Sequence, residues 1–287
     1  MDLVGYMQTE REAFSRSERH LADIVLSDVD AALSASIVDL AARAAVSPPT
    51  VTRFCRRIGC HSFSEFKVRL AQSRFVGQRY LTPPDGPETV SDIARHIINT
   101  AQATLYAAFD QIDADAVERA AQHIAEAGYV LSFGSGGASS MIAAEIETRL
   151  FRLGLRVTAS TDHQAQLMRT AGAPKGTVVI ASSTSGRNLP LAKTLAIAGE
   201  YGMRRVVLTR PGSPVAEQAD ILLPIDVPEA GDVLRPSSAR YAFLAVTDIL
   251  AQTVATRIQP QAIASMRRIK HQLVLNRDGD DSQPLGD

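Results

Sequence analysis

Residues 182–188, Ser-Ser-Thr-Ser-Gly-Arg-Asn, combine hydroxyl groups, a glycine and a positive charge in a way that suits a bound anion. They follow Val178, Val179 and Ile180, an unalternating β-branched run that is typical of a strand buried on both faces of a parallel sheet. Hydroxyl groups and the first N–H groups of a following helix donate to phosphate oxygens, and Arg187 adds a cation. The loop is therefore a candidate phosphate cradle, and an ordinary serine-rich helix cap is the alternative that the loop alone leaves open.

A second loop rich in glycine and hydroxyl groups, residues 134–140, follows a predicted strand at residues 129–133. Ligands of open α/β sheets bind at the carboxyl ends of the strands. Two such loops in one sheet therefore favour a phosphate site over a simple cap. Neither loop reads G-x-G-x-x-G, and no acid stands at the expected place after the next strand, so no dinucleotide or other cofactor is predicted.

The elements that must hold these loops alternate between strands and helices from Tyr129 onwards. This alternation predicts a parallel sheet with helices on both faces. After the last strand, one helix is predicted over about residues 238–256 and a shorter one ends near Leu273. The five predicted strands cover residues 129–133, 155–158, 177–181, 205–209 and 221–224.

The amino-terminal part of the chain carries only helical patterns. Ser17 is predicted to cap a first helix, and Ser36 is predicted to cap a second. A third helix is predicted to begin at Ser47, its cap, and to end at Gly59. A fourth is expected over about residues 62–73, so this part of the chain is predicted to be all-α.

The third of these helices is expected to turn an apolar face inward and a basic face outward. Val51, Phe54 and Ile58 recur at helical spacing and should pack inward. Residues 43–79 hold eight Lys and Arg against one Glu, whereas residues 1–42 hold three Arg against eight acids. A solvated helix face, the alternative, would not explain the missing acids. Two short helices with a tight turn and a basic second helix form the helix-turn-helix that enters the DNA major groove. The predicted DNA-binding residues are Ser47, Thr50, Thr52, Arg53, Arg56 and Arg57.

Composition and charge limit the class of protein. The chain has 287 residues, 45% of them hydrophobic, and a net charge of −1, which fits a soluble globular protein of one or two domains. The sequence shows no membrane-spanning run and no secretory signal, so a cytoplasmic location and no membrane partner are predicted. Cys55, Cys60 and His61 do not have the spacing of a metal site, so the cysteines are interpreted as incidental thiols and no metal is predicted.

Prolines and a glycine at residues 83–87 interrupt the helical patterns and mark a linker. Beyond it, a long helix is predicted from Val90 to about Phe109, and Asp113 is predicted to cap the next. The predicted organisation is a DNA-binding domain over residues 1–76, a linker over 77–88, a ligand-sensing domain over 89–275 and a flexible tail over 276–287.

These two groups of motifs together resemble those of a known family. Residues 17–72 closely resemble the helix-turn-helix of RpiR-type bacterial transcription regulators, and about residues 129–250 resemble their sugar isomerase (SIS) domain. The resemblance implies an all-α helix-turn-helix domain followed by an α/β SIS domain, with double-stranded operator DNA and a phosphosugar effector as partners, and a homodimer or tetramer. The matching residues of the first domain include Leu40-Ala41, Ala45-Val-Ser47, Thr50-Val51, Arg53-Phe-Cys-Arg56, Gly59 and Phe63-Ser-Glu-Phe-Lys67.

In related SIS domains the two loops hold the phosphate of a phosphosugar. The family's first loop reads Gly-x-Gly-x-Ser, and this sequence has Ser135, Gly137 and Ser139 at those positions, with the first glycine displaced to Gly134. The family's second loop reads Ser-x-Ser-Gly-Glu-Thr, where this sequence has Arg187 and Asn188 at the last two positions. These two departures leave the identity of the effector open, although Arg187 suits an anion. The resemblance implies the ligand-binding residues Gly137, Ser139, Ser183, Thr184, Ser185, Arg187 and Asn188.

The leading hypothesis is a regulator of carbohydrate metabolism genes whose effector is a phosphorylated sugar or sugar acid, with no catalytic residues. The alternative is a phosphosugar aldose-ketose isomerase, which needs a general base. Glu145, His163 and Glu229 are the candidates, although Glu145 could simply pair with Arg149 one helical turn away. A DNA-binding protein whose SIS domain serves only for dimerisation is a third hypothesis.

Overall fold

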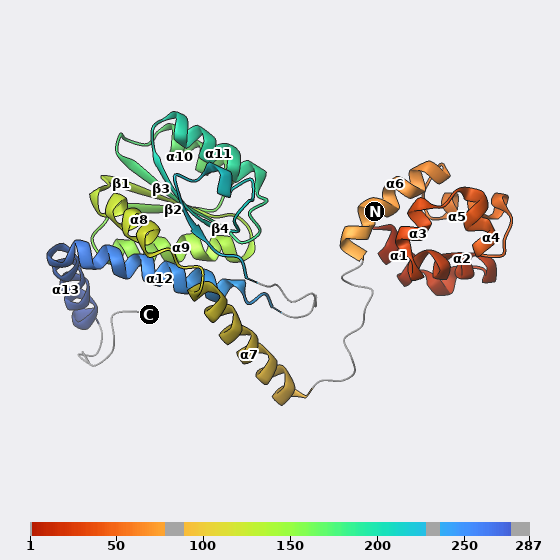
Figure 1. The fold of residues 1–287 in the computed structure, drawn as a ribbon, viewed down its shortest axis with the longest axis horizontal. Coiled ribbons are helices and arrows are strands. Elements are labelled where there is room, and N and C mark those ends of the chain that lie inside the picture. Colours follow the sequence, from red (N-terminus) through yellow and green to blue (C-terminus); the bar gives the residue numbers. More distant parts are fainter. Residues whose placement is uncertain (1, 78–88, 228–235, 277–287) are drawn as a thin grey trace. The chain divides into compact units, whose positions relative to one another are not determined.

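The chain forms two compact units, each with its own hydrophobic core (Figure 1). The computed structural model describes residues 2–77, 89–227 and 236–276. The helical unit contains residues 2–77, and the α/β unit contains residues 89–227 and 237–276. Residues 78–88 of the predicted linker and residues 277–287 of the predicted tail lie outside the described residues, so the predicted domain limits stay predictions.

The helical unit is built from short helices around one core. Val51, Phe54 and Ile58 are each at most 1% exposed, which confirms the inward face predicted for the third helix. Leu21, Leu40 and Phe66 of the other helices are buried to the same extent. Phe14 meets Phe54 edge to face, with ring centroids 5.6 Å apart. Its helices are α1 (Leu3–Thr9), α2 (Arg16–Ser27), α3 (Val29–Ser34), α4 (Ile37–Arg43), α5 (Pro48–Arg57) and α6 (Phe63–Gly77), with a 3₁₀ turn at Arg11–Ala13.

Helix caps in this unit are partly those that the sequence predicts. As predicted, Ser36 caps α4. Gly59, at a φ of 82°, follows the C-cap of α5 and stops that helix, also as predicted. The prediction that Ser17 caps α2 is wrong, because Ser15 has a glutamate three residues later and forms a capping box with it. Glu18 accepts from the backbone N–H of Ser15 at 2.9 Å, and the Ser15 hydroxyl accepts from Glu18 in return.

The α/β unit contains a five-stranded sheet in the order β2-β1-β3-β4-β5, and every neighbouring pair is parallel. This confirms the predicted fold class. β2 starts two residues later than predicted, because Gly154 adopts a φ of 86° and the N–H of Leu155 still bonds to Leu150 at the end of the preceding helix. The strands are β1 (Tyr129–Phe133), β2 (Val157–Ser160), β3 (Thr177–Ser183), β4 (Arg204–Thr209) and β5 (Ile221–Pro224).

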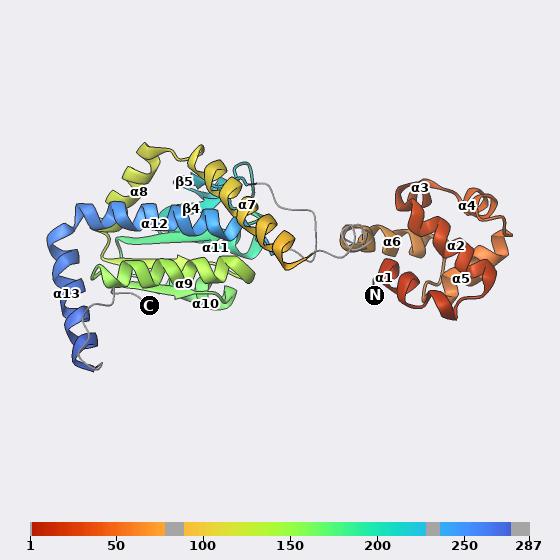
Figure 2. The same ribbon diagram turned by 90° about the horizontal axis from the view of Figure 1, so that it is seen from below.

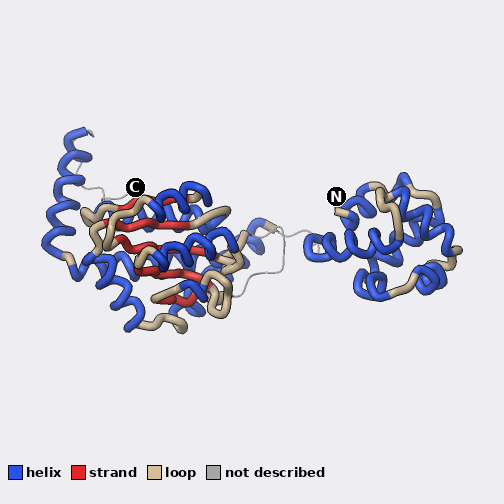
Figure 3. The backbone as a smooth tube through the Cα atoms, turned by 90° about the horizontal axis from the view of Figure 1, so that it is seen from above, coloured by secondary structure: helices blue, strands red, loops and turns tan. Residues whose placement is uncertain are grey.

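Helices cover both faces of this sheet (Figures 1 and 3). α8 (Ala114–Glu126), α9 (Gly137–Arg152) and α12 (Ala239–Arg257) pack on one face, against side chains that include Val178 and Ile180. α10 (His163–Ala171) and α11 (Leu189–Glu200) lie on the other, where Val179 and Ala181 point. β3 is buried along its whole length, which explains why its apolar residues do not alternate.

Two helices extend from the body of the α/β unit (Figure 2). α7 (Val90–Phe109) packs on α12 through its second half, where Thr104 donates a 2.8 Å hydrogen bond to the Ser238 hydroxyl. Its first half projects away from the sheet, and α13 (Gln259–Asn276) projects at the far end of α12. None of the helices that the structure describes combines the length and apolarity that a membrane span requires.

Candidate functional site

α4 and α5 form a helical pair joined by a tight turn. Ala45 closes the turn with a φ of 48°, and the N–H of Val46 bonds to Ala41 at 2.9 Å. Ser47 stands at the cap position of α5 as predicted, but its side chain makes no capping bond. Its hydroxyl instead lies 2.9 Å from the Thr50 hydroxyl, so both groups sit together at the exposed start of α5.

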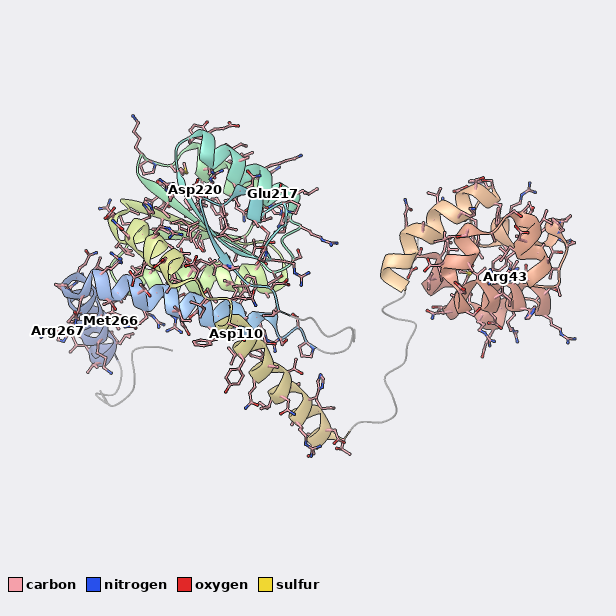
Figure 4. All side chains as sticks on the ribbon, viewed as in Figure 1. Arg43, Asp110, Glu217, Asp220, Met266 and Arg267 are labelled. Atoms are coloured by element: carbon pink, nitrogen blue, oxygen red, sulfur yellow. The ribbon has the colours of Figure 1, made fainter. Side chains whose placement is uncertain are left out.

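The basic residues near this pair fall into two groups. Some are held by their own unit: Lys67 donates to the carbonyl of Ala35, and Arg69 pairs with Glu65 at 2.7 Å. In contrast, no acid among the described residues pairs with Arg43, Arg53 or Arg56, and all three are exposed. Figure 4 labels Arg43 in the helical unit. These three arginines leave a positive surface that can contact phosphates.

Arg57 belongs to the group that the unit holds. Its guanidinium donates to the carbonyl of Ala13 at 2.8 Å, lies 5.8 Å from the centre of the Phe14 ring and approaches Glu18 at 3.8 Å. These contacts fix α5 to α2 and the segment before it. Of the predicted DNA-binding residues, Arg53 and Arg56 are therefore more available than Arg57. Thr52 donates to the Pro48 carbonyl of its own helix.

The two predicted ligand loops meet at the carboxyl ends of β1 and β3, which are neighbours in the sheet. α9 follows β1 onto one face and α11 follows β3 onto the other. This is the topological switch point at which ligands of open α/β sheets bind. We call Ser139, Ser183, Thr184 and Ser185, which gather here, the hydroxyl cluster.

Hydrogen bonds join the first turn of α9 to the end of β3. The N–H of Thr184 donates to the Ser139 hydroxyl at 3.2 Å, and the Ser182 hydroxyl donates to the Ser139 carbonyl at 3.0 Å. Gly134 makes this approach possible, because a Cβ there would collide with the Ser139 carbonyl group. Gly134, which stands one residue before the position of the first glycine in the family's loop, therefore has a steric role.

The hydroxyls of Ser139 and Ser183 accept backbone bonds and keep their own protons. Ser139 accepts from Thr184, and Ser183 accepts from the N–H of Gly186 at 3.1 Å. Both residues are at most 5% exposed, so their positions are set by the fold. A serine hydroxyl has one donor besides its acceptor lone pairs, and in neither residue does this donor bond to an acceptor among the described residues.

The rest of the β3 loop divides its polar groups between structure and solvent. Asn188 caps α11 by accepting from the N–H of Leu191 at 3.1 Å, so the helix cap is Asn188 and not the serines before it. Its amide nitrogen keeps two donors. Ser185 accepts from the N–H of Arg187 at 3.3 Å, and the exposed Arg187 has no acidic partner among the residues that the structure describes. Gly137 opens α9 with a φ of 43°.

The candidate general bases do not lie together in the structure. Glu145 lies 2.6 Å from Arg149, which also reaches Asp248 at 3.1 Å, so the predicted structural pairing is confirmed. Arg149 and Asp248 line a groove of about 530 Å³ between α9, α12 and α13, and none of the lining residues belongs to the hydroxyl cluster. Glu229 lies outside the described residues. Of the two candidates that the structure describes, only His163 lies at the carboxyl edge of the sheet, and Ser135 is its neighbour.

The two cysteines are buried free thiols. Burial raises the pKa of Cys55 to about 12, with Cys60 adding to the effect, and burial also raises the pKa of Cys60. Both remain protonated near neutral pH, whereas metal binding requires a thiolate. No group of three or more metal-ligating side chains occurs among the described residues.

A helix-turn-helix with a positive outer surface, joined in one chain to an α/β unit with donors at its switch point, defines the class of DNA-binding proteins that carry a ligand-binding domain. Comparison with known families agrees with this class. Residues 1–74 match the helix-turn-helix domain of the rpiR family, and residues 123–253 match the SIS domain.

Relatives match the chain over nearly its full length. The HTH-type transcriptional regulator HexR of Pseudomonas aeruginosa is 34% identical over 280 residues, which cover 96% of this chain and 97% of the relative. HexR of Escherichia coli is 32% identical over 278 residues, or 96% of both chains. Among solved structures, the Vibrio vulnificus NanR protein complexed with ManNAc-6P has a TM-score of 0.60 at 23% identity and covers 96% of this chain and 98% of its own.

The chain belongs to the RpiR family of helix-turn-helix transcriptional regulators that carry a SIS domain. It is therefore a regulator rather than an isomerase.

Proposed function

We propose that the α/β unit binds a phosphorylated sugar or sugar acid and that this effector controls DNA binding by the helical unit at genes of carbohydrate metabolism. The observation that carries the proposal is the pair of buried hydroxyls, Ser139 and Ser183, each fixed by a backbone N–H and each left with a proton to donate. The NanR protein, which shares this fold, forms a complex with ManNAc-6P.

The hydroxyl cluster has the donors that a phosphate requires. Hydrogen bonds to a charged oxygen are stronger than those between neutral groups. Phosphate has only acceptors to offer when fully ionised, and the exposed cation of Arg187 adds charge complementarity. The effector-binding residues that we propose are Gly137, Ser139, Ser183, Thr184, Ser185, Arg187 and Asn188.

On the DNA side, we propose that α5 lies in the major groove. Arg53 and Arg56 are exposed and without acidic partners among the described residues, which suits contacts with guanine edges or phosphates. Ser47, Thr50 and Thr52 contribute hydroxyl groups at the start of the same helix, and Arg57 contributes mainly by holding α5 in place. Such a role requires the compartment that holds the DNA, the cytoplasm of a bacterium.

We also infer that the chain works as a homodimer or a tetramer, with α7 at a two-fold contact. Six large apolar side chains of α7 are at least 42% exposed in the described chain, and soluble proteins usually cover such surfaces. A second copy suits this face, because a two-fold contact uses the same surface twice and helix-turn-helix proteins bind paired half-sites. The six are Val90, Ile93, Ile98, Leu105, Tyr106 and Phe109.

An effector changes DNA affinity only if it binds one arrangement of the protein better than another. In a dimer, the arrangement of the two α/β units would set the spacing of the paired α5 helices on a palindromic operator.

A thermal-shift screen of sugar phosphates tests the effector proposal. A true effector should raise the melting temperature of the wild-type chain, because a ligand that binds only the folded state stabilises it. Ser139→Ala and Ser183→Ala should lose this shift. Thr148→Ala is a matched control, since this α9 hydroxyl donates only to Ala144 of its own helix. A shift that survives both cluster variants, or that is lost equally in the control, would refute the proposed site.

Sedimentation equilibrium tests the α7 contact. Leu105→Glu combined with Phe109→Glu should yield monomers. Tyr201→Glu is the control and should not, because it changes an exposed ring at the end of α11, on the surface of the α/β unit but outside α7. An unchanged oligomer in the double variant would remove α7 from the interface.

A further inference from the structure

A second polar cluster lies beside the hydroxyl cluster, at the carboxyl ends of β1 and β2. It consists of Ser135 in the loop after β1, His163 at the start of α10, and Gln166 one turn later. Gln166 is fully buried, and its amide nitrogen donates to the Ser160 carbonyl at 2.8 Å and to the Ser135 hydroxyl at 3.0 Å. The Nδ1 atom of His163 lies 3.3 Å from the Gln166 amide oxygen and 3.4 Å from the Ser135 hydroxyl.

Elementary chemistry fixes the protons of this cluster. The Ser160 carbonyl can only accept, so the Gln166 amide must turn its nitrogen towards it. Both amide protons are then used, by Ser160 and Ser135. The remaining amide oxygen also can only accept, so the His163 Nδ1 atom that faces it carries a proton.

This arrangement leaves one donor and one acceptor for a ligand. A His163 ring whose single proton is on Nδ1 has an acceptor lone pair on Nε2, and no described residue bonds to that atom. The Ser135 hydroxyl already accepts from Gln166 and cannot donate to a protonated Nδ1, so its own proton is available.

We propose that Ser135 and His163 recognise a hydroxyl group of the effector's sugar, while the neighbouring hydroxyl cluster holds its phosphate. A sugar hydroxyl both accepts and donates, which matches the Ser135 proton and the His163 Nε2 lone pair. An ionised phosphate or carboxylate has no proton for Nε2 and fits the donors of the hydroxyl cluster better. Gln166 is the positioning residue, because it sets the direction of both groups. The inference rests on the proposed function.

The fold places the two clusters close to each other. Ser135 and Ser139 belong to the same short segment, and β1 pairs with β2 on one side and with β3 on the other. The N–H of Gly134 also bonds to the Ser160 carbonyl, which is the acceptor that orients Gln166. One ligand can therefore reach from the end of β3 to the end of β2.

Calorimetric titration with two kinds of probe tests whether one cluster binds the phosphate and the other binds a sugar hydroxyl. Inorganic phosphate probes the hydroxyl cluster alone, and a panel of glucose 6-phosphate, fructose 6-phosphate, N-acetylmannosamine 6-phosphate and 6-phosphogluconate probes both clusters. His163→Asn keeps a donor towards Gln166 but loses the Nε2 acceptor, and Ser135→Ala loses the donor. Each should weaken the best sugar phosphate about tenfold and leave phosphate affinity unchanged, since one neutral hydrogen bond is lost.

Two further variants separate recognition from structure. His163→Gln, which can restore an acceptor near the Nε2 position, should recover part of the sugar phosphate affinity. Ser183→Ala should weaken both kinds of probe. Deoxy analogues of the best sugar phosphate then identify the hydroxyl, because the affected analogue should bind wild type and Ser135→Ala equally weakly.

The outcomes distinguish the two levels of the proposal. Equal losses of phosphate and sugar phosphate in His163→Asn and Ser135→Ala, or no loss at all, would overturn the recognition role of this cluster and leave the proposed function intact. A wild-type chain that binds none of the probes, or a Ser183→Ala variant that binds them all normally, would overturn the proposed function itself.

Discussion

The outer face of α5 and the hydroxyl cluster use polar side chains in opposite ways. Arg53 and Arg56 are exposed and form no ion pair with an acid among the described residues, although Arg53 donates to the Thr50 hydroxyl at 3.3 Å, so both guanidinium groups can meet a long anion in several positions. Ser139 and Ser183 are buried and each accepts a backbone N–H, so their hydroxyl oxygens are held in fixed positions. The difference suits a surface that reads a polymer by charge and a site that recognises one small molecule by geometry.

This contrast predicts different responses to mutation. Charge lost from the α5 face should weaken DNA binding in a salt-dependent manner and leave the α/β unit untouched. A change in the hydroxyl cluster should remove effector binding and leave DNA binding without effector unchanged.

Arg53→Ala together with Arg56→Ala should weaken operator binding about 100-fold or more, because each lost arginine contact removes roughly 1–3 kcal/mol. The slope of log affinity against log salt should become shallower by about 2. Fluorescence anisotropy on the protein's own upstream DNA, at several salt concentrations, measures both.

The matched control for charge is Arg11→Ala together with Arg69→Ala. Both of these arginines already pair with acids of the helical unit, Asp23 and Glu65, so DNA affinity should change far less. If the control weakens DNA binding as much as the α5 variant does, net charge and not the α5 face governs the contact.

Ser183→Ala should weaken effector binding about tenfold to 100-fold, because a hydrogen bond to a charged oxygen contributes roughly 1.5–3 kcal/mol. Calorimetric titration with the effector found in the thermal-shift screen provides the measurement. Equal affinity of wild type and Ser183→Ala would show that the buried hydroxyl does not face the phosphate.

Gly134→Ala should destabilise the α/β unit by roughly 1–3 kcal/mol, because the added Cβ would collide with the Ser139 carbonyl. Gly128→Ala is the matched control, since a Cβ there has no atom within 4 Å and the residue has no positive φ. Urea unfolding followed by circular dichroism compares the two variants. Equal stability would mean that α9 can move away from β1 without cost.

The smallest predicted effect concerns the ion pair between Arg205 and Asp220, at 2.9 Å. Figure 4 labels Asp220 on the α/β unit. The Arg205 side-chain hydrogen bond lowers the pKa of Asp220 below its usual value. The folded state therefore resists protonation, and the stabilisation is present above the unfolded-state pKa and is lost as pH falls through the folded-state pKa. Asp220→Asn should cost up to about 1 kcal/mol at pH 7 and flatten the acid side of the stability profile. An unchanged acid profile in Asp220→Asn, measured by urea unfolding from pH 7 to pH 3, would contradict this.

Sequence patterns predicted the elements well where one signal dominated. The β-branched run of β3, the Ser36 cap and the Gly59 stop each have a single physical cause that is local in the chain. Ser17 was the wrong cap because two serines compete there, and only the glutamate three residues after Ser15 decides between them. The start of β2 was misplaced because the turn after Gly154 keeps Leu155 bonded to the preceding helix.

The candidate site was predictable in outline but not in its bonding. The glycine and hydroxyl content of the two loops predicts that they form a site. Which hydroxyl keeps an unused donor depends on contacts between residues more than 40 positions apart in the chain, such as Thr184 with Ser139. Gln166 was missed altogether, because a glutamine in a helix ordinarily faces solvent. Arg57 was grouped with Arg53 by charge, and only the structure reveals its bond to Ala13.

The proposed function requires that an effector bound at the hydroxyl cluster changes DNA binding by the helical unit. Operator anisotropy, measured with and without the effector in wild type and in Ser183→Ala, tests it most directly. We predict that the effector changes the apparent DNA affinity of wild type severalfold or more, and that Ser183→Ala binds DNA like wild type without effector but no longer responds to it. A response of the same size in Ser183→Ala would contradict the claim.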